Sequence, residues 1–527
     1  MSSCGLGEAE LRHLVAPFLD RPQPLWSLNL SENPGRLPAD FLPQMLYNLV
    51  ELRELNLRGS LQAGWDTTTT LIPSEILDQL ECLEELDVSG FKLNYATIRD
   101  LGDFLHHRAR NDHRKYPVKL RKLALNHCGL TGSEAAKICR AMGFNSDMHL
   151  SLSGNPLEDG IEDLADVIRA SQVPTGLYLE VIEFKEESNY ILLIRALAET
   201  KSVSLLSLAG TAPTPSLDSI HQTCSTEIIE ALNYLFTHNK SIRYLDLSGF
   251  SGKLEDGQLA KGFARALANL SENTTMTHLK IRNQNLHEDV GTLGRVLAEN
   301  QTLRVLDCQD NRLNLTSMKF LVSSLKENNR IIDFPFTTAE RAAIWRNILQ
   351  GFHKTPAGTP CPPKGAGPAG KLNNAQDVML RDVLNRQFDE IDEHLRRNRL
   401  ALEEAAGQLL DFDMSADSLE DMEDTWLGLD PDEAEPSGLG SDDTTPTTVH
   451  RSPRRPTVRS SYIDMSLPAP YHVRHGIDGL ESPTETLDPP SEISTPPELE
   501  SPEEAVPEGV SFKQMMHEFR ESGFNTT

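Results

Sequence analysis

Cysteine is scarce in this chain, and no two cysteines have the spacing of a typical metal-ligand pair. The sequence has 7 cysteines among 527 residues and contains no C-x-x-C pair. An odd number of cysteines at irregular distances is typical of a reducing compartment rather than of a disulfide-built secreted domain. We therefore predict no metal site and no cofactor, and we expect a cytoplasmic protein.

Long apolar runs and basic clusters are also missing. No stretch approaches the ~20 apolar residues that a membrane-spanning helix needs, and the N-terminus lacks the basic-then-apolar order of a signal peptide. The 50 Lys and Arg residues are outnumbered by 78 Asp and Glu residues, which gives a net charge of −28. This balance argues against general nucleic-acid binding, which requires clustered cations. We expect protein partners, with no nucleic acid and no membrane span.

The common catalytic signatures are absent as well. The sequence contains no G-x-x-x-x-G-K-[ST], no H-E-x-x-H and no G-x-S-x-G, and its 16 histidines are scattered. These motifs place phosphate-binding loops, zinc ligands and activated serines. We therefore predict a protein that is not an enzyme.

What the sequence does contain is one phrase, L-x-x-L-x-L-x-x-[N/C], repeated along the chain before residue 350. Copies run from Leu25 to Asn33, from Leu120 to Cys128 and from Leu303 to Asn311. The first positions of all copies are Leu25, Leu52, Leu83, Leu120, Asp147, Val203, Ile242, Met276, Leu303 and Ile331. A fixed period of this kind is the signature of a solenoid.

The phrase also indicates the structure of each unit. Its fourth and sixth positions point the same way from a short strand, and a helical pattern such as residues 133–142 follows. A base period of 27 to 29 residues resembles the ribonuclease-inhibitor type of leucine-rich repeat. The resemblance implies an α/β fold over residues 4–350: a horseshoe-shaped leucine-rich-repeat solenoid with one strand and one helix per repeat.

The repeat is irregular in three respects. A gap of 56 residues between Asp147 and Val203 predicts one weak copy around residues 177–179. The stretch from Cys4 matches the one from Cys128 in the middle of a unit, so either the first helix caps the solenoid or the chain is a truncated product. Longer gaps predict loop insertions at residues 62–70, 108–116 and 212–226.

The third and fifth positions of each phrase should face outward on the concave side. We predict that a protein partner binds there through Glu54, Glu85, Asp87, Lys122, Tyr244, Asp246, His278, Lys280 and Arg282. The early repeats would present an acidic patch, and the segment from His278 to Arg282 a basic one. A bipolar surface suits a protein partner better than a small ligand, and a merely solvated face is the alternative.

The composition changes after the repeats. Residues 351–376 form a Pro/Gly linker, and residues 377–410 have an apolar stripe at three- and four-residue steps, which predicts one amphipathic helix. That helix could fold back on the solenoid, pair with itself as a coiled coil, or bind a partner. Residues 411–527 form an acidic and Pro/Ser/Thr-rich tail, which we expect to be disordered.

The tail contains several short motifs. Trp426 and Leu429 follow acids and resemble the W-x-x-L motif read by autophagy ubiquitin-like proteins. Val510 and Phe512 resemble the docking motif of protein phosphatase 1, although the usual preceding basic residue is absent. Thr457 follows two arginines in a basic segment, His450–Arg459, as in basophilic kinase sites. Further phosphorylation candidates precede proline, at Ser452, Ser482, Thr495 and Ser501.

The order of solenoid, linker, helix and tail resembles the CARMIL and tropomodulin group of cytoskeletal regulators. It also resembles the leucine-rich-repeat regulatory subunits of protein phosphatase 1. We predict a non-enzymatic scaffold or regulator, which these resemblances would connect to the actin cytoskeleton, with a tail tuned by phosphorylation. The alternatives are a phosphatase-targeting subunit and a GTPase activator of the Ran type, in which Arg58 would align loosely with the activating arginine.

Overall fold

The computed structural model describes the repeats, the helices that close them and no part of the chain beyond residue 410. The described residues are 2–20, 24–33, 41–59, 70–110, 120–143, 147–213, 224–250, 257–259, 262–286, 289–353 and 374–410. Residues 1–403 form one compact unit, to which the description below refers. None of the described helices has the length and apolar character needed to cross a membrane.

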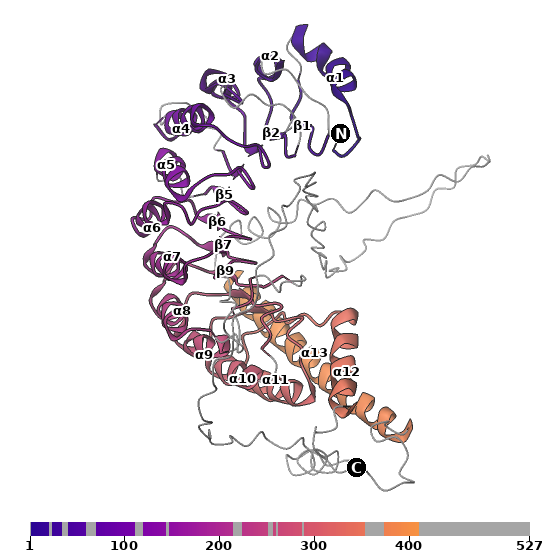
Figure 1. Ribbon diagram of the computed structural model, residues 1–527. Helices are drawn as coiled ribbons and strands as arrows, with labels where there is room; N and C mark the ends of the chain where they lie inside the picture. Colours follow the sequence, from indigo (N-terminus) through magenta and orange to yellow (C-terminus); the bar gives the residue numbers. More distant parts are fainter. Residues whose placement is uncertain are drawn as a thin grey trace, which may run out of the picture. The chain divides into compact units, whose positions relative to one another are not determined.

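The fold is a leucine-rich-repeat solenoid built on a parallel sheet of ten three-residue strands. Figure 1 shows the helices along the outer side of the repeats and the strands of the sheet along the inner side. The strands, in spatial order, are β1 (Ser27–Asn29), β2 (Glu54–Asn56), β3 (Glu85–Asp87), β4 (Lys122–Ala124), β5 (His149–Ser151), β6 (Gly176–Tyr178), β8 (Leu205–Ser207), β10 (Tyr244–Asp246), β11 (His278–Lys280) and β12 (Val305–Asp307). Each strand occupies positions three to five of one phrase.

The repeated leucines set the register of the sheet. Leu28 of β1 pairs with Leu55 of β2, Leu55 pairs with Leu86 of β3, and the same match continues through Leu306 of β12. These central leucines are all buried. The weak copy predicted around residues 177–179 is confirmed, because β6 lies between β5 and β8 with Leu177 at the central position.

Helices cover the other side of the sheet. They are α1 (Glu8–Asp20), α2 (Phe41–Tyr47), α3 (Ser74–Gln79), α4 (Tyr95–Arg110), α5 (Gly132–Met142), α6 (Ile161–Arg169), α7 (Glu187–Glu199), α8 (Thr226–His238), α9 (Phe263–Leu267), η1 (Ala268–Glu272), α10 (Val290–Glu299) and α11 (Leu315–Glu327). Helix α5 shows how a unit is built: Thr131 and Glu134 form a capping box at its start, and Ala135, Ile138 and Met142 bury one face.

The predicted insertion at residues 212–226 is partly wrong. Ala212–Pro213 form a strand, β9, which pairs in parallel with β7 (Glu183–Phe184). Thr226 already belongs to α8, since Ser225 caps that helix by accepting a hydrogen bond from the Ile228 amide at 3.2 Å. The predicted insertion at residues 108–116 is also shorter, because Arg108 to Arg110 continue α4. The remaining parts of the predicted insertions lie outside the described residues, apart from Thr70, Cys224 and Ser225.

Two series of buried amides join successive repeats. At the ninth position of the phrase, Asn155 donates to the Leu125 and Leu152 carbonyls, both at 2.8 Å. Just before the later strands, Asn300 donates to the Leu270 carbonyl at 2.7 Å and accepts from the Leu303 amide at 2.7 Å. The second series consists of Asn239, Asn273, Asn300 and Asn328. These bonds satisfy backbone groups that the turns leave without partners.

The last repeat is reduced to a single bridge between Val305 and Asp333, followed by α12 (Thr338–His353). The long helix α13 (Asn374–Leu410) then packs against this end, with Phe388 5.4 Å from Phe336 between ring centroids. Its apolar stripe is buried at Leu380, Leu384, Phe388, Ile391 and Leu395. Of the three fates considered for this helix, folding back on the solenoid is the one observed.

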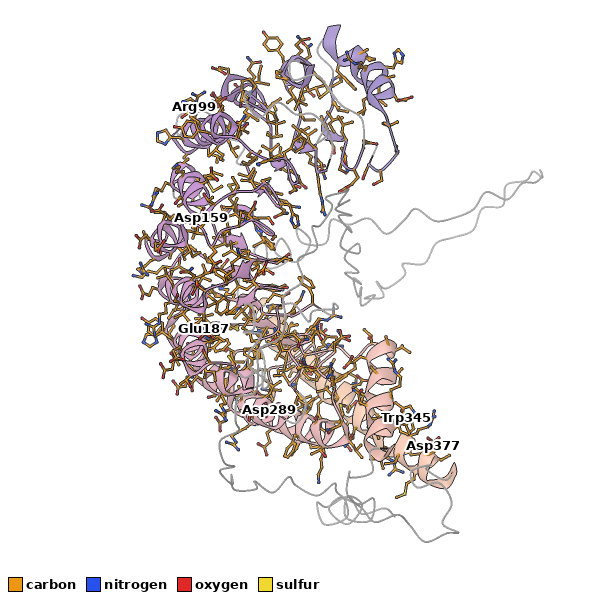
Figure 2. The ribbon with its side chains drawn as sticks, in the orientation of Figure 1. Arg99, Asp159, Glu187, Asp289, Trp345 and Asp377 are labelled. Atoms are coloured by element: carbon orange, nitrogen blue, oxygen red, sulfur yellow. The ribbon has the colours of Figure 1, made fainter. Side chains whose placement is uncertain are left out.

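Polar contacts fix α13 beside α12. The Arg381 guanidinium lies 4.7 Å from the centre of the Trp345 ring and pairs with Asp377 at 3.0 Å. Figure 2 labels Trp345 and Asp377 at this junction. Arg341 of α12 lies over Phe388 and also pairs with Asp392 at 2.9 Å. The helix therefore closes the solenoid with both apolar and charged contacts.

Candidate functional site

Aromatic, acidic and basic side chains come together on the strand side from β6 to β12, which we call the strand face. Because side chains alternate along a strand, positions three and five point away from the helices while position four is buried. In-register pairing then sets Tyr244 beside His278 and Asp246 beside Lys280. Lys280 in turn lies beside Asp307. The register thus gathers residues that are far apart in the sequence.

Aromatic rings and cations stack along this face. The Tyr244 and His278 rings are 6.0 Å apart, and the Lys280 ammonium lies 5.3 Å from the centre of the Tyr244 ring. His149 and Tyr178 form a similar pair at 6.2 Å in the preceding repeats. A cation over an aromatic face is attracted by the ring quadrupole.

Carboxylates lie between these rings. Glu180 accepts a hydrogen bond from the Ser207 hydroxyl at 2.6 Å. Asp246 and Asp307 are each only 8% exposed, and each accepts from a backbone amide in the following turn. Arg282 pairs with Asp310 at 3.1 Å. Arg243 and Arg304 lie directly before β10 and β12, so this part of the face has both signs of charge.

Burial changes the protonation of these groups. Burial raises the pKa of Glu180 and of Asp307, although Arg282 opposes the rise at Asp307. Burial also raises the pKa of Glu340, which accepts from the Asp310 amide at 3.1 Å, to about 7. For His278, burial and the nearby Lys280 lower the pKa, which favours the neutral ring. A cation that approaches such a desolvated carboxylate stabilises its ionised form.

The surroundings of Lys280 and Arg282 correct one prediction. The segment from His278 to Arg282 was predicted to be a basic patch, but Asp246, Asp307 and Asp310 act electrostatically on Arg282. The charge there is therefore mixed, with Lys280 and Arg304 also acting on His278. The sequence pattern missed these groupings because neighbours come from adjacent repeats, about 27 to 34 residues apart.

Two contributors to the strand face were not identified from the sequence. Tyr178 and Glu180 occupy positions five and seven of the weak copy, whose first position is Pro174. That copy lacks the leading leucine, so its outward positions were not assigned. Its intact pair Leu177 and Leu179 was the signal that could have located them.

The predicted residues of the early repeats lie on the same side of the sheet. Glu54 is exposed, Glu85 lies 3.9 Å from the Lys122 ammonium, and Asp87 accepts from the Ser89 amide at 2.9 Å. Arg58 is half exposed and lies 3.5 Å from Glu32. These residues do not form the dense cluster found from β6 to β12.

The predicted tail motifs lie outside the described residues and stay predictions. They comprise Trp426, Leu429, Val510, Phe512 and the phosphorylation candidates Ser452, Thr457, Ser482, Thr495 and Ser501. Within the described ranges, no group of three or more His, Cys, Asp or Glu side chains is placed to hold a metal ion.

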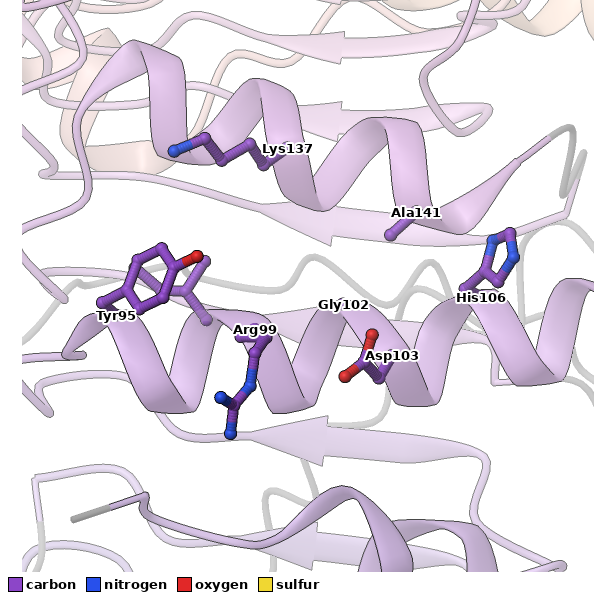
Figure 3. Close-up of a pocket in the computed structure, with 8 residues that line it drawn as sticks. Tyr95, Arg99, Gly102, Asp103, His106, Lys137 and Ala141 are labelled. Atoms are coloured by element: carbon purple, nitrogen blue, oxygen red, sulfur yellow. The ribbon is translucent and has the colours of Figure 1, made fainter.

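A hollow of about 310 Å³ lies on the helix side, between α4 and α5. Tyr95, Arg99 and Asp103 of α4 and Lys137 and Ala141 of α5 line it, and Figure 3 shows these two helices side by side. The hollow exists because Gly102 and Ala141 leave little side-chain volume between the two helices. Its charges are mixed, and Arg99 is already paired with Asp100 at 2.9 Å.

Comparisons with known proteins give limited likenesses. No protein-family description matches the chain. The Rho GTPase-activating protein gacW of Dictyostelium discoideum is 34% identical over 128 residues, which are 23% of this chain and span only 11% of that relative. Among solved structures, the leucine-rich repeat-containing protein LegL7 of Legionella pneumophila is 18% identical, with a TM-score of 0.33, over 61% of this chain and 85% of that one. The tropomodulin C-terminal domain of Caenorhabditis elegans is 14% identical, with a TM-score of 0.22, over 47% and 98%.

Proposed function

We propose that the protein is a cytoplasmic, non-enzymatic scaffold or regulator that binds a protein partner on the strand face. The observation that carries the proposal is the register that gathers Tyr244, His278, Lys280 and Asp307 on one surface. Aromatic and charged side chains in a partly desolvated setting are typical of the residues that dominate protein interfaces. The phosphorylation candidates of the tail would regulate this binding, and a role at the actin cytoskeleton belongs to the same proposal.

A matched pair of double variants tests the proposal. Tyr244→Ala with Lys280→Ala removes an aromatic ring and an ammonium from the strand face, where the two lie 5.3 Å apart. Tyr95→Ala with Lys137→Ala removes the same groups from the helix-side hollow. Each full-length variant, checked for unchanged helix content by circular dichroism, is used for affinity capture from cell extract with quantitative mass spectrometry.

We expect the strand-face variant to lose its specific partners at least about tenfold, since central interface residues dominate binding energy. The helix-side variant should retain them. Equal capture by both variants and the wild-type chain would rule out the strand face as the binding surface.

A second candidate function is GTPase activation, for which the similarity to the Rho GTPase-activating protein gacW provides the motivation. An activator would need an exposed arginine, and Arg58 has about half of its side chain exposed. The test is GTP hydrolysis by purified Rho-family and Ran GTPases, with the intact chain and with Arg58→Ala. An absence of stimulation by the intact chain excludes this function.

A further inference from the structure

The cations and the carboxylates of the strand face differ in exposure. Positions two to eight of the phrases from β6 to β12, all of which the structure describes, contain the cations Arg243, Lys280, Arg282 and Arg304 and the carboxylates Glu180, Asp246, Asp307 and Asp310. Asp246 and Asp307 are each 8% exposed, whereas none of these cations is buried. The charge that a partner can reach on this face is therefore mainly positive, in a chain whose net charge is −28.

The more accessible carboxylates are already engaged within the chain. Asp310 lies 3.1 Å from the Arg282 guanidinium. Glu180 accepts a hydrogen bond of 2.6 Å from a serine hydroxyl of β8. Just beyond β12, Asp333 lies 3.8 Å from the Arg399 guanidinium. These contacts leave little negative charge on the surface for the cations of a partner.

The cations at the edge where the strands begin are not engaged in this way. Arg243 and Arg304 lie directly before β10 and β12, and neither guanidinium forms a hydrogen bond or an ion pair among the described residues. Arg243 is exposed, and Arg304 acts electrostatically on His278, which places it beside the strand face. Lys280 lies 5.3 Å from the centre of the Tyr244 ring rather than beside a carboxylate. Cations next to aromatic rings are thus available to a partner on this part of the face.

The register of the sheet fixes the distance between the two arginines. Because β10, β11 and β12 are neighbours, the main chains at Arg243 and Arg304 are two strand intervals apart, or about 10 Å. Residues seven apart in an α-helix are separated by about 10.5 Å along its axis. A helix with carboxylates at that spacing can bring one to each arginine, while the residues between them reach the Tyr244 and His278 rings.

We propose that the partner of the strand face binds β10 to β12 through an acidic helix, with two of its carboxylates paired with Arg243 and Arg304. Arginine pairs with a carboxylate through two parallel hydrogen bonds, so such a contact has direction as well as charge. A basic segment would instead be repelled by the accessible cations of this surface. This inference rests on the proposed function and adds the chemistry of the partner.

A charge reversal with a matched control tests the two arginines. Arg243→Glu with Arg304→Glu should lower partner capture by the full chain at least about tenfold, because two attractions become repulsions. Arg265→Glu with Arg295→Glu makes the same change in net charge at exposed positions of α9 and α10, and it should leave capture within about twofold of the wild type. Circular dichroism checks that both variants remain folded. Equal capture by the two variants would overturn the proposal.

Zero-length cross-linking then identifies the groups that meet the arginines. Arg243→Lys with Arg304→Lys keeps both charges and supplies amines, which a carbodiimide joins to neighbouring carboxylates as amides with loss of water. We expect adducts from both positions to Asp or Glu residues about seven apart in one partner peptide, mapped by tryptic mass spectrometry. Adducts to unrelated peptides, an absence of adducts at both positions, or capture that is abolished by nuclease treatment of the extract would each refute the acidic helix.

The outcomes also separate this proposal from the proposed function. If Tyr244→Ala with Lys280→Ala abolishes partner capture while the reversal at Arg243 and Arg304 does not, the strand face binds its partner by other chemistry. In that case the acidic helix is wrong and the proposed function stands. If neither variant changes capture, the proposed function itself fails.

Discussion

Asn398 of α13 donates a hydrogen bond to the main-chain oxygen of Asn328, at 3.1 Å, across 70 residues of sequence. It donates a second bond to the Ile331 carbonyl at 2.8 Å. Asn328 makes the equivalent pair of bonds to Leu297 and Asn300 in the preceding repeat. A helical residue thus occupies the place that a further repeat would fill, and it satisfies the carbonyls at the end of the solenoid.

We expect Asn398→Ala to destabilise the chain by about 2–3 kcal/mol, because two buried carbonyls lose their donor. Asn385→Ala is the control, since Asn385 is exposed on the same helix and should change stability by less than about 0.5 kcal/mol. Chemical denaturation followed by circular dichroism measures both. Equal stabilities of the two variants would contradict the role given to Asn398.

Substitution of Gln387, on the same helix, should change the stability of the chain in the opposite direction. Its side chain is 3% exposed, and neither its amide nitrogen nor its amide oxygen has a hydrogen-bond partner among the described residues. Replacing a buried, unsatisfied amide by an apolar group of similar size removes a desolvation penalty. Gln387→Leu should therefore stabilise the chain by about 1–2 kcal/mol. A lower melting temperature than that of the wild type would show that the amide is satisfied in solution.

The titration of Glu340 should make the stability of the folded chain fall as the pH rises. Burial raises its pKa from 4.5 to about 7, so between these values the folded chain holds the proton more tightly than the unfolded chain does. This contribution is full below about pH 4.5 and is lost as the pH rises through about 7, which lowers the stability by about 3–4 kcal/mol.

Glu340→Gln removes the titration while its amide oxygen can still accept from the Asp310 amide. Thermal unfolding from pH 5 to pH 8 should show the variant gaining on the wild type as the pH rises. Parallel curves for the two proteins over this range would refute the shifted pKa.

Substitution by alanine at two glycines one repeat apart should change the stability of the chain in opposite directions. A Cβ at Gly132 would lie 2.5 Å from the Gly160 carbonyl oxygen and 2.6 Å from that of Leu157, so Gly132→Ala forces the backbone apart. A Cβ at Gly102 would meet only the Ala141 side chain at 3.8 Å. Since alanine favours a helix interior, Gly102→Ala should stabilise by about 0.5–1 kcal/mol, while Gly132→Ala destabilises by at least about 1 kcal/mol. The melting temperatures of the two variants are the measurement, and shifts of the same sign would contradict this reading of the packing.

The solenoid was predictable because its information is local and repeated. Leu28, Leu55 and Leu86 recur at one position of one phrase, and that alone determines strand, register and burial. The degenerate copy was found from Leu177 and Leu179 and the length of the gap around it. The apolar stripe likewise predicted a helix over residues 377–410, although residues 351–353 and 374–376, assigned to the linker, belong to α12 and α13.

The electrostatic character of the strand face was not predictable to the same extent. Whether Arg282 is part of a basic patch depends on Asp307 and Asp310, which belong to the next repeat and whose effect depends on burial. Glu340 reaches the same neighbourhood from α12, outside any repeat position. Such cross-repeat contacts become visible only when the stacking of side chains is known.

The in-register pairing of the strands also gives the strand face a fixed spacing from one repeat to the next. Neighbouring strands in a sheet lie about 4.8 Å apart, so β6, β8, β10, β11 and β12 span about 19 Å. An α-helix laid across them presents one turn every 5.4 Å and drifts by about 0.6 Å per strand. A straight helix would therefore be out of step by more than 2 Å at the fifth strand. An ordinary helix can therefore stay in step with only three or so strands at a time, and an extended segment, whose same-face side chains recur every ~6.7 Å, departs further from the 4.8 Å interval.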